Sequence, residues 1–150
     1  MKILTLIPLL AALLFSTSYK TQLIADFAKL TPLDAELTTV VYPFPVTFKT
    51  VENQGQNLKM AFMDSKPNNW NGKTIVLLHG KNFNGYYFEE TAKALNKDGF
   101  RVIMPDQIGF GKSSKPKQYQ FSFQQLAENT KAILDDLKIE KFILLGHSMG

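Results

Sequence analysis

A serine between two glycines stands at the carboxyl end of the sequence and is its best candidate for covalent chemistry. Gly146, Ser148 and Gly150 form the pattern G-x-S-x-G, directly after the apolar run 142–145. A strand that enters such a pentapeptide is typical of a nucleophile elbow, in which a sharp turn exposes the serine hydroxyl above the sheet edge. The glycines would leave room for a tight, strained turn. The alternative interpretation is a small-residue turn that only ends a strand.

A serine hydroxyl is a weak nucleophile near neutral pH and needs a neighbouring base. The sequence contains two histidines, His79 and His147. His147 is adjacent to Ser148 on a sharp turn, so its side chain should point away, and we expect it to be a packing residue. The histidines are far apart and the chain has no cysteine, which argues against a zinc site and excludes a cysteine nucleophile. We therefore expect neither a metal nor an organic cofactor.

The elements that would position this serine alternate along the chain. Continuous apolar runs predict three strands buried on both faces, at 74–78, 100–104 and 141–145. Helical spacing predicts helices between them, at 86–96 and 123–137, and Ser122 is a plausible N-cap of the second. The expected inward residues are Tyr87, Ala94 and Leu95 in the first helix and Phe123, Leu126, Ala127, Thr130, Ile133, Leu134 and Leu137 in the second. Alternating segments at 46–51 and 58–63 predict a preceding antiparallel hairpin. This order predicts an α/β fold, a mostly parallel sheet with helices on both faces.

Unusual residues follow all three predicted buried strands. His79 and Gly80 follow the first, Asp106 follows the second, and Ser148 follows the third. Ligands of parallel sheets bind beyond the carboxyl ends of the strands. We therefore expect these residues to share one edge of the sheet.

With these landmarks in order, residues 42–150 resemble the N-terminal half of an α/β-hydrolase. The resemblance rests on the hairpin, His79-Gly80, the run from Asp106 to Ser114, and the pentapeptide 146–150. It implies a hydrolase that cleaves an ester or similar acyl bond of a small molecule through Ser148. Carbon–carbon bond hydrolases and cofactor-free haloperoxidase-like members also keep the serine and remain alternatives. Dehalogenase and epoxide-hydrolase branches use aspartate at this position.

The resemblance also implies how the transition state would be stabilised. An oxyanion hole needs two backbone donors. The amide of Met149 would supply one, and the loop after Gly80 would supply the other, from Lys81 or, next in line, Asn82. In the family the histidine corresponding to His79 makes structural hydrogen bonds.

Asp106 has two interpretations, as a catalytic acid or as a brace of the following loop. Because the similar aspartate of the family is a structural turn residue, we expect Asp106 to brace the loop through Gly109 and Gly111. Four aromatic residues after the oxyanion loop could line an acyl pocket or pack a helix against the sheet: Phe83, Tyr86, Tyr87 and Phe88.

In the family the catalytic acid and the base histidine follow the nucleophile, whereas the sequence of 150 residues stops at Gly150. We therefore expect an N-terminal fragment of the hydrolase domain that is inactive by itself. A hypothesis from another class is a genuine short product, catalytically dead, that serves as a binding protein.

The N-terminus predicts export. Lys2, the apolar run 3–15 and the small residues 16–18 are typical of a signal peptide over residues 1–18, too short to span a bilayer. Export to the periplasm or medium follows, and an uncleaved N-terminal membrane anchor is the alternative. Residues 19–41 would be a lead-in segment, partly helical, and 42–150 the hydrolase part.

The net charge of +4 is spread without a basic block, which argues against nucleic-acid binding.

Overall fold

The computed structural model describes residues 19–27 and 31–150. The predicted signal peptide, 1–18, lies outside the described residues. The chain divides into two compact units, Met1–Leu33 and Asp34–Gly150. The described part of the first unit contains a helix over residues 19–27, and the second unit contains the sheet and the candidate site. None of the helices within the described residues is long and apolar enough to cross a membrane.

The second unit contains the predicted antiparallel hairpin, formed by β1 (Val46–Asn53) and β2 (Gln56–Ser65). Both strands run further than the alternation predicts, so that the turn consists of Gln54 and Gly55 alone. Both turn residues have positive φ, 50° and 69°, as both central positions of a type I′ turn require. This turn type matches the right-handed twist of the paired strands.

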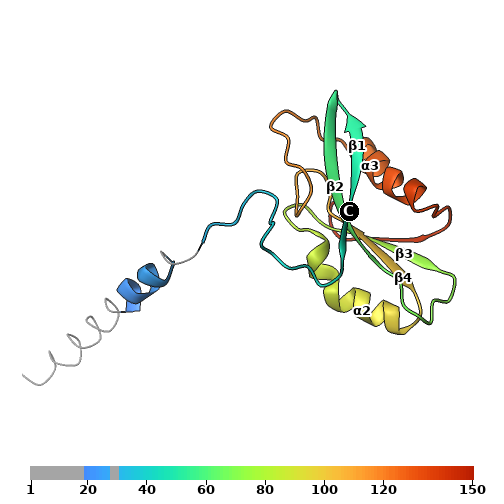
Figure 1. The fold of residues 1–150 in the computed structure, drawn as a ribbon, viewed down its shortest axis with the longest axis horizontal. Coiled ribbons are helices and arrows are strands. Elements are labelled where there is room, and N and C mark those ends of the chain that lie inside the picture. The colour runs from blue at the N-terminus through green and yellow to red at the C-terminus, as the bar shows by residue number, and fades with distance from the viewer. Residues whose placement is uncertain (1–18, 28–30) are drawn as a thin grey trace, which may run out of the picture. The chain divides into compact units, whose positions relative to one another are not determined.

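Five strands form one mixed sheet in the order β1-β2-β4-β3-β5. β4 (Arg101–Pro105) pairs antiparallel with β2 and parallel with β3 (Thr74–Leu78). β3 in turn pairs parallel with β5 (Ile143–Gly146). The three predicted parallel strands are therefore neighbours, as Figure 1 shows, and the predicted α/β fold with an initial hairpin is confirmed.

Helices cover both faces of this sheet. The 3₁₀ helix η1 (Gly85–Phe88) leads into α2 (Glu89–Lys97), and α3 (Phe123–Asp136) precedes β5. Side chains alternate along each strand, so Ile103 of β4 packs in the core with α3, whereas its neighbours Val102 and Met104 pack in the core with α2. Figure 1 shows α2 and α3 on opposite sides of the sheet.

The N-cap prediction for α3 is confirmed, whereas parts of the predicted apolar faces are wrong. The Ser122 side chain accepts a hydrogen bond from the Gln125 backbone amide at 3.1 Å. Phe123 and Ala127, placed on the apolar face of this helix by their spacing, are exposed. They lie in the first turns of α3, beside an open cavity described below.

The helix predicted at 86–96 is divided into a 3₁₀ helix and an α-helix. The division changes which residues point toward the core. Residues 85–88 form the 3₁₀ helix, and the α-helix begins at Glu89. Phe88 and Ala92 are buried, whereas Tyr87 and Ala94, expected to point inward, are exposed. A 3₁₀ turn has three residues per turn, so the spacing expected of a continuous α-helix does not hold across this junction.

The prediction that residues 141–145 form a strand buried on both faces is wrong in its burial. Every residue of β5 is exposed, including Leu144 with 56% of its surface. The reason is its position at the edge of the sheet: within the described residues β5 pairs with β3 alone. The same kind of apolar sequence in β3 is buried because β3 has a strand on each side.

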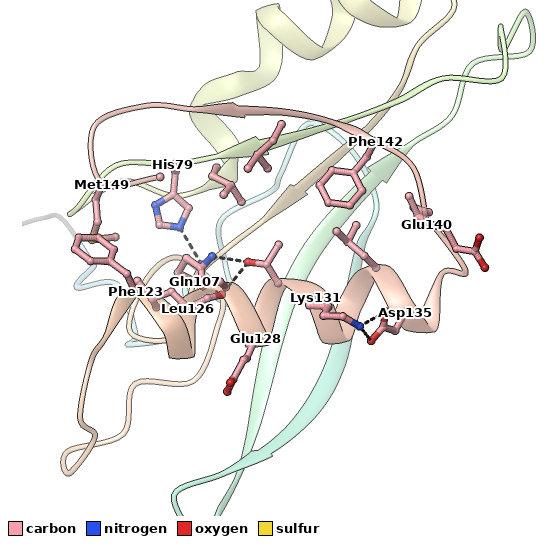
Figure 2. Close-up of a pocket in the computed structure, with 17 residues that line it drawn as sticks. His79, Gln107, Phe123, Leu126, Glu128, Lys131, Asp135, Glu140, Phe142 and Met149 are labelled. Atoms are coloured by element: carbon pink, nitrogen blue, oxygen red, sulfur yellow. Dashed lines mark hydrogen bonds and ion pairs between the residues drawn. The ribbon is translucent and has the colours of Figure 1, made fainter.

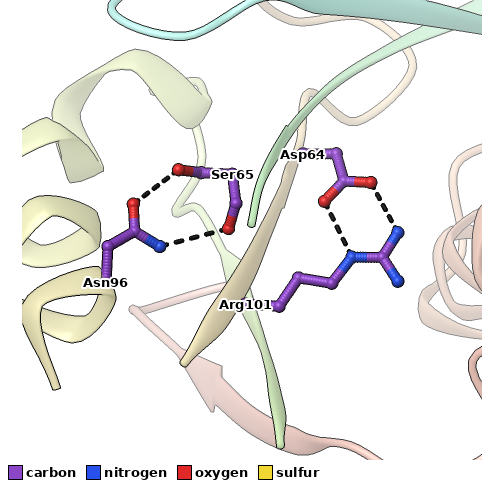
Figure 3. A network of polar contacts seen from close by, with 4 residues as sticks. All are labelled: Asp64, Ser65, Asn96 and Arg101. Carbon is purple, nitrogen blue, oxygen red and sulfur yellow. Dashed lines mark hydrogen bonds and ion pairs between the residues drawn. The ribbon is translucent and has the colours of Figure 1, made fainter. Parts of the chain in front are cut away.

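Polar contacts join β2 to β4 and to α2 at the end of the sheet opposite to the strand exits. The Arg101 guanidinium donates to the Asp64 carboxylate through Nε at 2.8 Å and Nη2 at 2.5 Å, which links β4 to β2. Asn96 of α2 donates to the Ser65 carbonyl oxygen at 3.1 Å and accepts from the Ser65 hydroxyl. Figure 3 shows the two pairs on either side of the sheet. Since Arg101 begins β4 and Asp106 follows its last residue, these contacts lie at the other end of the strand.

Candidate active site

The structure brings the exits of β3 and β5 together. Leu78 is the register partner of Gly146, and the His147 amide donates to the Leu78 carbonyl oxygen at 3.0 Å. Gly80 then passes so close to the turn that a Cβ atom added to it would lie 3.1 Å from the Ser148 Cβ. The loop after β3 and the serine after β5 are therefore in direct contact.

Ser148 lies on a tight, exposed turn. The Gly150 amide donates to the His147 carbonyl oxygen at 3.1 Å, which closes a turn over residues 147–150. Ser148 has a φ of 59°, a conformation that costs a non-glycine residue about 1–2 kcal/mol. A Cβ atom on Gly146 would overlap the Gly150 carbonyl, and one on Gly150 would overlap the Leu78 carbonyl. Both glycines of the pentapeptide are therefore required by close backbone approach.

The three backbone amides expected to form the oxyanion hole have no acceptor among the described residues. The Phe83 amide donates to the Gly80 carbonyl oxygen at 3.1 Å, closing a turn in which Asn82 has a φ of 67°. Among the hydrogen bonds of residues 19–27 and 31–150, none has the amide of Lys81, Asn82 or Met149 as its donor. These amides can therefore still bind an acceptor from outside the chain.

His79 is buried at the centre of the strand exits and uses both ring nitrogens. The Gln107 amide donates to its Nε2 at 2.9 Å, so Nδ1, 2.8 Å from the Gly80 carbonyl oxygen, must carry the proton and donate. Burial lowers the pKa of His79, an effect that the Gly80 contact and Asp106 partly oppose. The imidazole is thus neutral near neutral pH and has no free nitrogen to accept a proton from Ser148.

The Asp106 carboxylate is buried and accepts three hydrogen bonds. The Gly85 amide donates to its Oδ1 at 2.6 Å, and the Lys112 amide and the Tyr42 hydroxyl donate to its Oδ2, each at 2.8 Å. Burial, followed by the nearby carboxylate, raises the pKa of Tyr42, so its hydroxyl stays protonated and donates. Gly111 packs against this carboxylate so closely that a Cβ atom there would overlap it.

These contacts differ in detail from the bracing through Gly109 and Gly111 that the sequence suggested. The hydrogen-bond donors are Gly85, Lys112 and Tyr42, of which Tyr42 is 64 positions away. Of these donors, only Gly85 could have been suspected from the sequence. Asn84 is a residue type that caps helices, and the glycine after it allows another group to approach closely. Asn84 does cap η1, accepting from the Tyr86 amide at 3.0 Å. Tyr42 lies in a proline-rich entry segment and carries no such signal.

The four aromatic residues of this region have different neighbours. Phe88 is buried in the core with α2, and Tyr86 packs edge-on against Tyr42 at a centroid distance of 5.5 Å. Phe83 and Tyr87 instead lie around His147, with centroid distances of 5.8 Å and 5.7 Å. His147 is thus a packing partner of exposed rings beside the serine.

A cavity of about 740 Å³ lies between α3 and the ends of β3 and β5. Figure 2 shows Phe123 and Met149 at one end and Phe142 and Glu140 at the other, with the Gln107 side chain donating to Thr130. Its walls include the exposed side of β5, whereas Ser148, Lys81 and Asn82 do not line it. We therefore assign no substrate to this cavity. The described residues contain no group of three or more histidines and carboxylates placed to hold a metal ion.

Comparison with known proteins agrees with this geometry. Residues 73–150 match the family model described as the alpha/beta hydrolase fold. The chain belongs to the alpha/beta hydrolase fold family. It is 38% identical over 79 residues to the AB hydrolase superfamily protein YisY of Bacillus subtilis, a match that covers 53% of this chain and 29% of that protein. It is 31% identical over 120 residues to a haloalkane dehalogenase of Mycobacterium marinum, with 78% of this chain and 40% of the relative covered.

A solved structure of a probable hydrolytic enzyme from Pseudomonas aeruginosa PAO1 is also similar. It superposes with a TM-score of 0.76 at 48% sequence identity, over 79% of this chain and 38% of that one. An esterase from Exiguobacterium antarcticum superposes with a TM-score of 0.57 at 31% identity, over 63% of this chain and 33% of that one. The matches to the curated relatives named above cover 29% and 40% of their lengths. The homologues are hydrolase enzymes of this fold.

Proposed function

We propose that the full-length protein containing this chain hydrolyses an ester or similar acyl bond of a small molecule, with Ser148 as nucleophile. The observation that carries the proposal is the placement of Ser148. It is exposed, has a φ of 59°, and packs against Gly80, where the loop after β3 begins. Strained backbone at an exposed, chemically competent side chain is characteristic of functional sites.

The chemistry follows from the groups around the serine. The Ser148 Oγ attacks the carbonyl carbon of the substrate and its proton passes to a general base, which by family resemblance is a histidine later in the full-length chain. The carbonyl oxygen becomes an oxyanion, which the Met149 amide and the amide of Lys81, with Asn82 next in line, would bind. Collapse of this intermediate expels the alcohol, protonated by the same base, and leaves an acyl-enzyme. Water, deprotonated by that base, then releases the acid and restores the Ser148 hydroxyl.

Two lines of support separate this reaction from those of some relatives. Similar proteins are named haloalkane dehalogenase and epoxide hydrolase B, and by family resemblance those branches use aspartate where this chain has Ser148. The amides of Lys81, Asn82 and Met149 are unused within the described residues, as donors that wait for a substrate oxyanion must be. An acyl-enzyme on serine needs no metal or organic cofactor.

The other motif residues would support this site without reacting. His79 and Asp106 have their polar atoms engaged in hydrogen bonds that join the strand exits. Gly146 and Gly150 allow the backbone contacts of the turn. We assign these four residues, with Gly80, a structural role.

We also propose that the protein is exported, because Lys2, the apolar run 3–15 and the small residues 16–18 form a signal-peptide pattern. N-terminal sequencing of the protein recovered from its native host tests this. A new N-terminus close to Tyr19 is expected, and an intact Met1 on the folded protein would contradict it.

Hydrolysis of a panel of short p-nitrophenyl esters by the full-length protein tests the reaction. Ser148→Ala should lower kcat by at least about a thousandfold, because loss of a serine nucleophile removes the covalent route, while the thermal midpoint is preserved. Ser122→Ala is the matched control: it removes an exposed serine hydroxyl that caps α3 and should keep the wild-type kcat. Equal activity of Ser148→Ala and wild type would contradict the proposal.

A further inference from the structure

Tyr87 makes a specific polar contact beside the candidate nucleophile. Its hydroxyl lies 2.8 Å from Nδ1 of His147, the residue that precedes Ser148. The two rings meet nearly edge to face, with an interplanar angle of 65°. Phe83 contacts both rings, at centroid distances of 5.1 Å from Tyr87 and 5.8 Å from His147. His147 is therefore held on one side by an aromatic pair and a hydrogen bond.

The main chain of His147 is also held at both of its polar atoms. Its amide donates to the Leu78 carbonyl oxygen at 3.0 Å, and its carbonyl oxygen accepts from the Gly150 amide at 3.1 Å. The Tyr87 contact is thus a third restraint on this residue and the one that fixes its side chain. Ser148 follows directly with its positive φ, and such a conformation persists only where the surroundings determine it.

Tyr87 is itself well anchored. Its ring stacks on Phe88 at a centroid distance of 4.2 Å, and Phe88 is buried in the core with α2. The start of η1 is tied to the buried Asp106 carboxylate through the Gly85 amide at 2.6 Å. A continuous set of contacts therefore leads from the sheet core through η1 to His147 and the serine turn.

We propose that Tyr87 is a positioning residue: its hydroxyl fixes His147 and thereby holds the Ser148 turn in the conformation that presents Oγ. This inference rests on the proposed function for its effect on catalysis, but its effect on the turn is independent of any reaction. A single hydrogen bond of this kind contributes on the order of 1 kcal/mol, which corresponds to a change of about fivefold in a rate or an opening equilibrium.

The experiment compares Tyr87→Phe with Tyr86→Phe in the full-length protein. The two tyrosines are neighbours in η1 and have similar exposure, 38% and 40%. The Tyr86 hydroxyl makes no hydrogen bond to any described residue, and its ring packs on Tyr42 instead. Each variant removes one hydroxyl and keeps the ring, so the pair isolates the contacts of the Tyr87 hydroxyl, with His147 and with the Gly80 backbone, from the packing of its ring.

Three readouts are measured: the rate of labelling by a fluorophosphonate probe, kcat and KM for a p-nitrophenyl ester, and hydrogen exchange of the peptide that contains residues 145–150. Tyr87→Phe should slow labelling and lower kcat by about fivefold and speed exchange by a similar factor, whereas KM stays nearly unchanged. Tyr86→Phe should match wild type in all three. A helix-packing role alone would change the thermal midpoint and leave labelling, kcat and exchange at their wild-type values.

His147→Phe completes a double-mutant cycle. If Tyr87 acts through His147, the double variant Tyr87→Phe/His147→Phe should be no slower than His147→Phe alone, whereas independent roles would give additive losses. Wild-type labelling and exchange in Tyr87→Phe would overturn the proposal. Absence of any Ser148-dependent labelling in wild type would instead contradict the proposed function, and the exchange rates would then decide the role of Tyr87 by themselves.

Discussion

The buried bracket formed by His79 and Asp106 and the exposed turn that carries Ser148 lie at the same sheet edge, yet their environments are opposite. In the bracket, both ring nitrogens and both carboxylate oxygens are engaged in hydrogen bonds. At the turn, the serine is exposed, its φ is positive, and neighbouring amides are unused within the described residues. Polar residues at strand ends are therefore not equivalent: the buried, hydrogen-bonded groups hold the loops, whereas the side chain of Ser148, the nucleophile that we propose, is exposed and makes no hydrogen bond to any described residue.

Removing the Asp106 carboxylate should have the largest effect on the bracket. Asp106→Ala leaves the Gly85 and Lys112 amides and the Tyr42 hydroxyl without their acceptor in a buried site. We expect the free energy of unfolding to fall by about 3–5 kcal/mol, since each buried donor left unsatisfied costs about 1–3 kcal/mol. Urea unfolding measures this loss.

The result also tests whether the bracket and the turn are distinct in role. If Asp106→Ala had the wild-type free energy of unfolding but hydrolysed no ester, Asp106 would be a catalytic residue and not a structural one.

The pH dependence of stability should report on His79. Its pKa is lowered in the folded protein by burial, so between that value and the ordinary value of about 6.5 the unfolded chain binds a proton that the folded protein does not. The contribution of His79 to stability is therefore complete above about pH 6.5 and is lost as pH falls below it, by at most about 1.4 kcal/mol per pH unit. His79→Gln should flatten this part of the curve, measured by urea unfolding between about pH 7.5 and about pH 5. An unchanged slope would mean that His79 takes up a proton as readily in the folded as in the unfolded chain.

The smallest effect is expected at an exposed serine whose hydroxyl already has a partner. Ser122→Ala removes the N-cap of α3 and should cost about 1 kcal/mol of unfolding free energy. Thermal unfolding of Ser148→Ala beside Ser122→Ala compares the proposed nucleophile with a serine that caps a helix. A larger loss of stability in Ser148→Ala than in Ser122→Ala would indicate that the turn serine also has a structural partner.

Much of this arrangement could be predicted from sequence because it depends on local patterns. Apolar runs located β3, β4 and β5, and the alternation of strands with helices along the chain predicted that these strands lie side by side. The position of Ser148 beside Gly80 follows from those parallel pairings. The burial of β5 could not be predicted, because the apolar run of residues 142–145 has the same character as β3 and only the number of neighbouring strands differs.

Contacts between segments that lie far apart in the chain could not be predicted from the sequence. Asp106 could be recognised as a brace only by resemblance, and its partners Tyr42 and Gly85 lie 64 and 21 positions away. The contact between Tyr87 and His147 spans 60 positions. The phase of the helix that carries Tyr87 also depends on the 3₁₀ turn, which the spacing of apolar residues did not reveal.

Identification of the residue modified by a fluorophosphonate probe tests whether Ser148 is the nucleophile. The native full-length protein is treated with the probe, digested, and its peptides are sequenced by mass spectrometry. We expect one stoichiometric adduct, on the Ser148 hydroxyl, that disappears in Ser148→Ala. An adduct on another residue, or a folded protein that hydrolyses esters without any adduct at Ser148, would contradict it.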